Sequence, residues 1–218
     1  MAPDLRDTFE QLTSPDGPSF EEFYNIYADS IPLRERKTRG QISDMLNSPD
    51  YRNYCVKRGG AVIGFSSLFA PARESFCLLE YMAIGSAHRG SGVGKELFQH
   101  SVCSITSERG SIPVLLEVDS EREPSPDREV RLRRKRFYKS LGCFQIDGLA
   151  YLFPLPGWGT PPEMDLMVYV PIGFPPIRKA TIEHWLKVVY QQVYGCGPDD
   201  PRIPRMMKSV ADPLQLFR

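Results

Sequence analysis

The sequence predicts an α/β protein with a mixed, mostly antiparallel central sheet and helices on both faces. Three short apolar segments, residues 51–57, 61–69 and 76–84, follow one another across tight turns, which is typical of an antiparallel meander. The third segment leads through a glycine-rich loop into a stretch with helical periodicity, and residues 113–119 then form another buried strand. Because a helix separates these last two strands, we expect them to run parallel.

The composition limits the classes of partner. The 218 residues are 41% hydrophobic, enough for a substantial core, and 27 Lys and Arg residues balance 27 Asp and Glu residues. A chain with zero formal net charge has no general attraction to nucleic acid or to an anionic membrane. The first residues lack a basic and apolar leader, and no apolar run is long enough to span a bilayer. We therefore expect a cytoplasmic protein with neither nucleic acid nor membrane as a partner.

The cysteines and histidines predict no metal site. The cysteines are odd in number, lack a C-x-x-C pair, and fall mostly inside predicted strands or helices, so we expect reduced, mostly buried thiols at Cys55, Cys77, Cys103, Cys143 and Cys196. Three scattered histidines, His88, His100 and His184, have no companion ligands.

The region before the meander predicts one short strand and two helices. Residues 8–13 form the candidate strand, and Ser19 with Glu22 forms a capping box that opens the first helix. The wide apolar stripe of this helix includes Tyr24 and Tyr27. A charged connector, residues 31–40, leads to the second short helix, residues 41–46.

The loop RGSGVG, residues 89–94, has the features of an anion site. Its three glycines, at positions 90, 92 and 94, lead into the helical stretch whose apolar positions begin at Val93. Backbone amides at a helix N-terminus have no intrahelical partner and carry partial positive charge. Glycine lets the backbone approach a phosphate without a Cβ atom in the way. The loop is therefore predicted to bind a phosphate group.

The spacing of this loop excludes two common phosphate sites. A nucleotide-hydrolysing P-loop needs four residues between its first glycine and the Gly-Lys pair, then a hydroxyl residue, but here only three residues separate Gly90 from Gly94, and Glu96 follows Lys95. The dinucleotide fingerprint fails because Lys95 stands where its third glycine would be. The pattern Arg/Gln-x-x-Gly-x-Gly/Ala does fit, with Arg89, Gly92 and Gly94.

With this motif the sequence resembles the GNAT superfamily of acyl-CoA-dependent N-acyltransferases. The match is strongest over residues 79–98 and extends more loosely over residues 5–172, where a strand at 113–119 and an aromatic-tyrosine-x-x-x-glycine element at 137–142 keep the expected order. The resemblance implies a GNAT-type sheet that is splayed between its fourth and fifth strands. It also implies that the first helix and the connector after it line the acceptor side of the cleft, so Tyr24 and Tyr27 either pack in the core or face the substrate.

The resemblance assigns the acyl-CoA contacts residue by residue. The pantetheine arm would enter the splay and pair with the main chain of Met82, Ala83 and Ile84. The pyrophosphate would lie on the loop and first helical turn formed by Arg89, Gly90, Ser91, Gly92, Val93, Gly94 and Lys95. Acetyl-CoA is then the acyl-donor co-substrate, and no metal is expected.

The second half of the chain predicts two helices and two further strands. A helix from about residue 127 carries basic residues on all sides, which are either solvated or meet phosphates or an acidic partner. Strands at 143–153 and 165–171 are joined by a loop rich in proline and glycine that contains Trp158, either a wall of the acceptor pocket or a rigid surface turn. An additional helix, 178–194, could pack on the sheet, cover the cleft or mediate a homodimer, and the tail 195–218 is expected to be irregular.

We expect a GNAT domain at 1–175 and a C-terminal helical extension at 176–218.

Two residues are the candidate catalytic groups. Glu80 is the candidate general base, because a carboxylate among apolar neighbours on a central strand is costly unless it is paired or used, and a salt bridge to an arginine is the alternative. The resemblance places a tyrosine near the sulfur of CoA, and Tyr138 matches it as the candidate general acid. Glu117 and Asp119, continued by Glu121 and Glu123, either make the cleft mouth acidic for a cationic amine or serve as partners of the basic helix.

The predicted function is that of an N-acetyltransferase. The protein would transfer an acetyl group from acetyl-CoA to a primary amine of a small molecule or a protein by direct attack of the amine. The alternative is a non-catalytic acyl-CoA sensor or interaction module of GNAT fold, which could form oligomers through residues 178–194.

Overall fold

The computed structural model describes residues 6–122, 125–154 and 163–218. The chain divides into two compact units, Met1–Gly110 and Ser111–Arg218. In these described ranges no helix is both long enough and apolar enough to cross a membrane.

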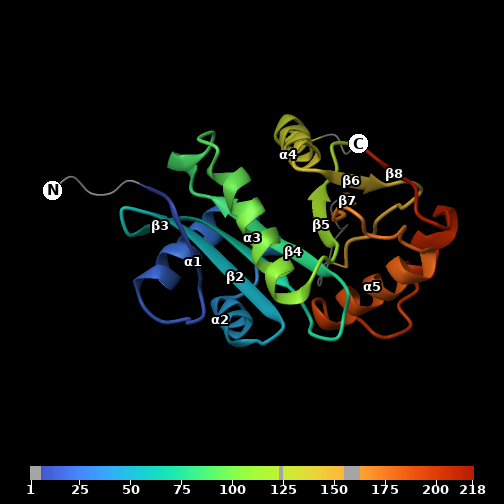
Figure 1. The fold of residues 1–218 in the computed structure, drawn as a ribbon, viewed down its shortest axis with the longest axis horizontal. Helices are drawn as coiled ribbons and strands as arrows, with labels where there is room; N and C mark the ends of the chain where they lie inside the picture. Colours follow the sequence, from blue (N-terminus) through green and yellow to red (C-terminus); the bar gives the residue numbers. More distant parts are fainter. Residues whose placement is uncertain (1–5, 123–124, 155–162) are drawn as a thin grey trace. The chain divides into compact units, whose positions relative to one another are not determined.

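The first unit contains the predicted antiparallel meander (Figure 1). Its strands follow the order β1, β2, β3, β4, and each neighbouring pair is antiparallel. The two tight turns and the apolar runs place the strands close to the predicted ranges. The elements are β1 (Thr8–Gln11), α1 (Pro18–Ser30), η1 (Leu33–Glu35), α2 (Arg39–Asn47), β2 (Tyr51–Arg58), β3 (Ala61–Phe69), β4 (Cys77–Ile84), η2 (Ser86–His88) and α3 (Val93–Arg109).

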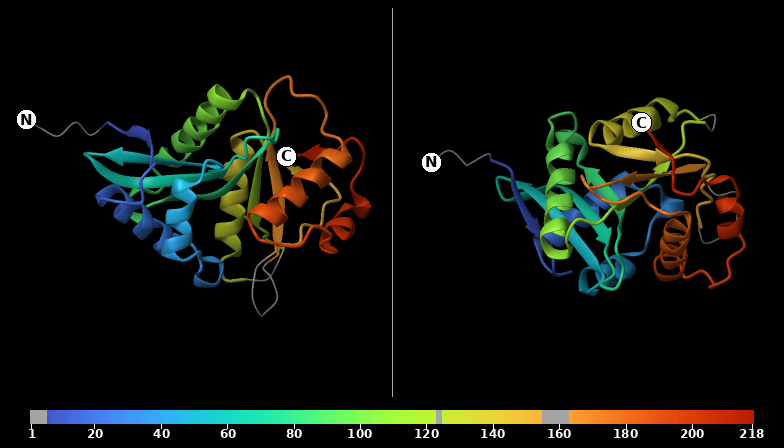
Figure 2. Two further views of the ribbon diagram at one scale, coloured as in Figure 1. Left: turned by 90° about the horizontal axis from the view of Figure 1, so that it is seen from below. Right: turned by 45° about the vertical axis from the view of Figure 1, so that its right-hand side comes forward.

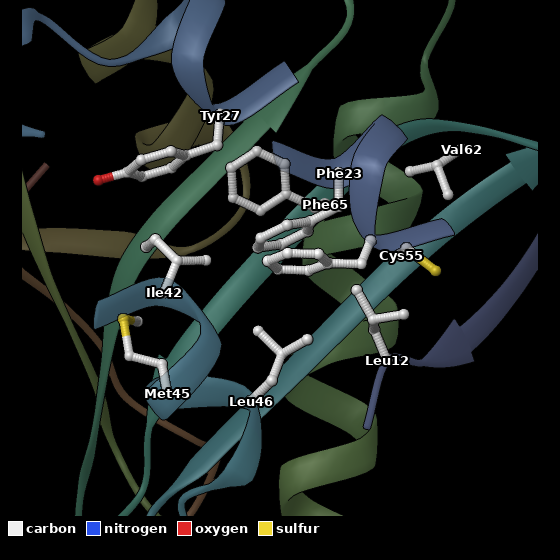
Figure 3. Packing of buried hydrophobic residues seen from close by; sticks show 10 residues of the cluster. Leu12, Phe23, Tyr27, Ile42, Met45, Leu46, Cys55, Val62 and Phe65 are labelled. Carbon is white, nitrogen blue, oxygen red and sulfur yellow. The ribbon is translucent and has the colours of Figure 1, made fainter. Parts of the chain in front are cut away.

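Helices cover both faces of the first unit's strands, as predicted (Figure 2, left). Helices α1 and α2 lie on one face and α3 on the other. The core on the α1 side is a cluster of aromatic and aliphatic side chains in which Phe23 and Phe65 meet edge to face with ring centroids 4.4 Å apart (Figure 3). Tyr27 is fully buried in this cluster, whereas Tyr24 packs against it half-buried. The core alternative for Tyr27 is therefore the one that the structure supports.

The predicted capping box of α1 is wrong. The helix begins at Pro18, after Gly17, and no side chain caps it, because Ser19 already lies within the first turn. Proline suits this first position, since it has no amide hydrogen to satisfy and its φ is already helical. The Glu22 carboxylate instead accepts a hydrogen bond of 2.8 Å from the backbone amide of Val62. A complete capping box occurs at α2, between Thr38 and Gln41.

The second unit has the strand order β5, β7, β6, β8, with antiparallel neighbours. Helix α4 lies against β5 and β6, and α5 lies on the opposite face (Figure 2). The elements are β5 (Val114–Asp119), α4 (Arg128–Ser140), β6 (Cys143–Ile146), β7 (Met164–Tyr169), α5 (Lys179–Gln192), α6 (Arg202–Met206), η3 (Met207–Ser209) and β8 (Leu216–Phe217). The predicted fold class, an α/β chain with mostly antiparallel strands and helices on both faces, is confirmed. The splay and the domain boundary at residue 175 stay predictions.

Two predictions in the second unit are wrong. The strand expected at 143–153 ends at Ile146, and the tail expected to be irregular contains α6 and β8. The strand ends because Asp147 and Gly148 form a turn, with Gly148 at φ +71°. The tail is ordered because it returns to the sheet, where Gln145 pairs with Phe217 and Ile146 with Leu216. The apolar residues of α5 are buried, including Trp185 and Leu186.

A network of buried charges connects α4 to β7. Lys135 is buried and forms ion pairs with Asp165, at 2.6 Å, and with Glu121. Asp165 also accepts hydrogen bonds of 2.9 Å from Arg122 and from Gln145. Among the alternatives for the basic helix, Lys135 therefore has acidic partners within the protein and is not solvated.

The cysteines are free thiols in different environments. Cys55, Cys77 and Cys143 are buried, and burial raises the pKa of each to about 12. Cys196 is half-buried, and Cys103, on α3, is exposed. Within the described ranges, no three His, Cys, Asp or Glu side chains lie together in a way that could hold a metal ion.

Candidate functional site

The glycine loop turns sharply into α3. Gly92 is the N-cap residue in the left-handed conformation, with φ +91°, and Gly90 has φ +79°. A side chain would be strained at both positions. A Cβ atom built on either glycine has no neighbouring atom within 4 Å. The loop backbone therefore faces open space.

The amides of this loop are free to bind a ligand. The amides of Lys95 and Glu96 both donate to the Gly92 carbonyl, at 2.9 and 3.3 Å. The preceding amides, those of residues 90–94, donate to no group in the described part of the chain. Adjacent donors at the positive end of a 17-residue helix suit a phosphate. The residues present thus fit the pyrophosphate of a CoA thioester.

Hydrogen bonds hold the loop in this shape. The Arg89 guanidinium donates to the carbonyl of Ile84 at 2.9 Å, which ties the loop to the end of β4. The Ser91 hydroxyl donates to the His88 carbonyl at 2.7 Å. A hollow of about 470 Å³ lies beside residues 85–89, between the end of α1 and the start of β3. Arg89 borders this hollow, whereas the Ser91 hydroxyl is hydrogen-bonded within the loop.

The three residues assigned to the pantetheine arm form the last part of β4. Met82, Ala83 and Ile84 are half-buried and pair with residues 64–66 of β3. In an antiparallel pair, alternate residues direct their backbone groups toward and away from the partner strand. Part of this backbone therefore points away from β3, as pairing with an extended ligand requires.

A β-bulge in β4 sets the direction of the Glu80 side chain. Tyr81 pairs with Ser67 and Leu79 with Leu68, so Glu80 is an extra residue on β4. Adjacent strand residues normally point to opposite faces, and a bulge changes this and often re-aims a side chain near a site. Glu80 and Tyr81 indeed both contact Lys37, the first through an ion pair and the second with its ring centroid 5.6 Å from the ammonium nitrogen.

The Glu80 carboxylate is almost fully enclosed. Its side chain is 2% exposed, and it accepts hydrogen bonds from the Lys37 ammonium and, at 2.7 Å, from the Tyr51 hydroxyl. The alternative of a salt bridge is therefore present, but its partner is a lysine rather than the expected arginine. Lys37 and Tyr51 are not among the predicted site residues. Lys37 could have been suspected from its place in the charged connector, whereas nothing in the sequence pairs Tyr51 with Glu80.

Two phenols, the buried Tyr27 and the half-buried Tyr81, complete this group, which we call the Glu80 cluster (Glu80, Lys37, Tyr51, Tyr27 and Tyr81). The rings of Tyr27 and Tyr81 meet edge to face with centroids 5.1 Å apart, and the Tyr27 oxygen accepts a hydrogen bond from the Lys37 amide at 2.7 Å. Burial raises the pKa of both phenols, and the Glu80 charge adds to the effect. Both remain protonated at neutral pH.

Tyr138 lies in the second unit, on α4. Its side chain is buried, and its ring packs edge to face against Phe137 at 5.2 Å. Burial raises the pKa of Tyr138 to about 12, although the charge of Arg134 acts in the opposite direction. The phenol is therefore protonated at neutral pH, as a proton donor must be.

The acidic residues after β5 mostly serve structural partners. Asp119 forms an ion pair with Arg134, and Glu121 forms one with Lys135. Glu117 accepts hydrogen bonds from the hydroxyls of Tyr151 and Tyr194. For Asp119 and Glu121 the alternative of partners for the basic helix is thus confirmed. Glu123 and Trp158 lie outside the described residues.

Comparisons with known proteins agree with this arrangement. The sequence profile of the Acetyltransferase (GNAT) family matches residues 20–142. No significant match is found among curated proteins. Among solved structures, a GNAT-family protein described as an acetyltransferase from Bacteroides thetaiotaomicron is 22% identical, with a TM-score of 0.69 over 87% of this chain and 99% of that one.

Two further solved structures show the same fold. The ribosomal-protein-S18-alanine N-acetyltransferase of Escherichia coli is 18% identical, with a TM-score of 0.56 over 78% of this chain and 96% of that one. A GNAT acetyltransferase from Elizabethkingia anophelis with acetyl-CoA bound is 15% identical, with a TM-score of 0.55 over 76% and 98%. The family match spans more than half of the chain, from α1 through the glycine loop to the end of α4. The chain therefore belongs to the GNAT family of acetyltransferases.

Proposed function

We propose that this protein is an N-acetyltransferase that uses acetyl-CoA as the acyl donor and a primary amine of a small molecule or a protein as the acceptor. The observation that carries the proposal is the row of amides at residues 90–94, which faces open space at the N-terminus of α3. A GNAT structure with acetyl-CoA bound supports the choice of ligand. The cytoplasmic location and the homodimer stay predictions.

The residues have separate roles in this proposal. Acetyl-CoA, when bound, supplies the acetyl group as a thioester. The loop amides and the N-terminus of α3 hold the pyrophosphate, and the backbone of Met82, Ala83 and Ile84 orients the pantetheine arm. Glu80 accepts a proton from the attacking amine, and Tyr138 donates a proton to the sulfur that leaves. Lys37 and Tyr51 fix the Glu80 carboxylate before the acceptor arrives.

One observation favours the alternative, an acyl-CoA sensor without turnover. Both partners of Glu80 come from the chain itself, and the carboxylate is 2% exposed. If these contacts never open, Glu80 is a structural ion-pair member and the site binds acyl-CoA alone. Steady release of free thiol from acetyl-CoA in the presence of an amine library separates the two proposals, because a sensor releases none.

The first test is a calorimetric titration of the purified protein with acetyl-CoA. Desulfo-CoA and ATP serve as comparison ligands, because both carry adenine and phosphates but neither carries a thioester. We expect saturable binding of acetyl-CoA and much weaker binding of ATP. Absence of binding by any CoA compound would overturn the proposal, since the free amides would then have no acyl-CoA to hold.

Gly92→Asp is expected to weaken acetyl-CoA binding at least about tenfold, or about 1.4 kcal/mol. The aspartate adds negative charge where the pyrophosphate is expected and strains the left-handed N-cap. The matched control is Gly60→Asp, because Gly60 has φ +88° and an equally open Cβ position but lies in the β2–β3 turn. Calorimetry should show weakened binding only for the Gly92 variant. Equal affinities of the two variants would remove the loop from the binding site.

A further inference from the structure

We propose that Lys37 is itself an acyl acceptor, so that the protein acetylates its own Lys37 in the absence of another amine. The inference rests on the proposed function, because it needs acetyl-CoA bound along β4. Its starting observation is that the Lys37 amine already forms an ion pair with the Glu80 carboxylate, the candidate general base. An acceptor amine must occupy this same relation to the base.

The local structure holds the Lys37 amine in place. The backbone amide of Lys37 donates to the Tyr27 hydroxyl at 2.7 Å, and its ammonium lies 5.6 Å from the centroid of the Tyr81 ring. Tyr27 is fully buried, so the anchor at the base of this side chain is rigid. The capping box of Thr38 and Gln41 fixes the residue that follows. The amine therefore has little freedom to leave the carboxylate.

The amine is also near the expected thioester. Glu80 precedes Met82 by two residues, which corresponds to about 7 Å along a strand. The backbone of residues 82–84 is where the pantetheine arm is assigned, and its reactive end lies toward Glu80 if the pyrophosphate is on the loop after Ile84. A lysine amine bound to Glu80 is thus within reach of the carbonyl carbon without a rearrangement of the backbone.

The acetyl transfer needs no reactant other than Lys37, Glu80 and acetyl-CoA. Glu80 takes one proton from the Lys37 ammonium, and the neutral amine attacks the thioester carbonyl. A C–N bond forms and the C–S bond breaks. The second amine proton goes to the leaving sulfur, and the products are Nε-acetyl-Lys37 and CoA thiol. The proton on Glu80 is then lost to water.

Lys57 provides an internal control. Its side chain is 18% exposed, as is that of Lys37, and it also forms an ion pair with a carboxylate, that of Glu10. Lys57 lies on β2 and its partner on β1, in the register Thr8 to Lys57 and Glu10 to Cys55. The two equally exposed side chains are equally accessible to free acetyl-CoA in solution, and acylation from solution would not depend on Glu80. Acylation within the site would select Lys37.

The test is to incubate the protein with acetyl-CoA and no added amine, and to measure acetylation of each lysine by peptide mass spectrometry over time. We expect Lys37 to be acetylated at least about tenfold faster than Lys57, because its amine is held beside the bound donor. The rate constant should not change when the protein is diluted, since the step is intramolecular. Glu80→Gln should remove the preference for Lys37, whereas Glu10→Gln should leave it unchanged.

Parallel calorimetry on the same sample separates this inference from the proposed function. If acetyl-CoA binds and Lys37 is acetylated no faster than Lys57, the inference is wrong and the acetyltransferase proposal stands. If acetyl-CoA does not bind, the proposed function fails and the inference fails with it. A Lys37 rate that rises in proportion to protein concentration would also overturn the inference, because transfer would then occur between molecules.

Discussion

Replacing Tyr138 with phenylalanine is expected to lower kcat by about a hundredfold and to leave the Kd of acetyl-CoA unchanged. Burial keeps the phenol protonated, with a pKa of about 12, so the hydroxyl can donate a proton to the leaving thiolate. Phenylalanine retains the edge-to-face packing against Phe137 and removes only this donor. The loss should therefore appear in turnover and not in binding.

The measurement is thiol release from acetyl-CoA with an amine found by screening, together with a calorimetric Kd for the donor. Tyr54→Phe is the matched control, because Tyr54 is also a buried tyrosine whose pKa is raised by burial, but it lies on β2 and has no proposed role. An unchanged kcat for Tyr138→Phe would remove the general-acid role. A weakened Kd would make Tyr138 a binding residue.

Replacing Asp165 with leucine is expected to lower the free energy of unfolding by about 3–5 kcal/mol. Asp165 is buried and is the shared acceptor for Lys135, Arg122 and Gln145. Its removal leaves the buried Lys135 ammonium with the half-buried Glu121 as its remaining carboxylate. Urea unfolding of the purified variants measures the change.

Two further variants show whether the buried charge is the cause. Glu183→Leu removes one partner of the partly exposed Lys187–Glu183 pair on α5 and should change stability by about 0.5 kcal/mol or less. The double variant Asp165→Leu with Lys135→Leu should be more stable than Asp165→Leu alone, because the buried ammonium is removed together with its buried carboxylate partner. If the double variant is as unstable as the single one, lost packing explains the effect instead.

Features set by neighbouring residues could be predicted from the sequence. The meander follows from apolar segments separated by tight turns, and α3 begins where the glycine loop ends. Even short-range sequence patterns did not always predict the local structure correctly. Ser19 and Glu22 have the spacing of a capping box, but the helix already begins at Pro18, and the Glu22 carboxylate accepts a hydrogen bond from the Val62 amide on β3 instead. A two-residue pattern such as this one is compatible with a capping box, but tertiary contacts determine whether the capping box forms.

Features that join distant residues could not be predicted. Lys37 and Glu80 are 43 residues apart, and their ion pair depends on a β-bulge that no sequence pattern marks. The tail was expected to be irregular because of its prolines, yet Leu216 pairs with Ile146 across 70 residues of chain. In both cases the path of the backbone determines which two residues meet. The segment around each residue carries no sequence pattern that identifies its partner.

The burial of most cysteine thiols affects the background of an assay that follows acetyl transfer by the release of CoA thiol. A chromogenic disulfide reagent that counts released CoA also reacts with protein thiolates. Three of the five thiols are buried with a pKa of about 12, so they contribute almost no thiolate at neutral pH, and Cys103 is the exposed one. The protein background should thus saturate early at a small fixed amount per chain, while true turnover continues to rise.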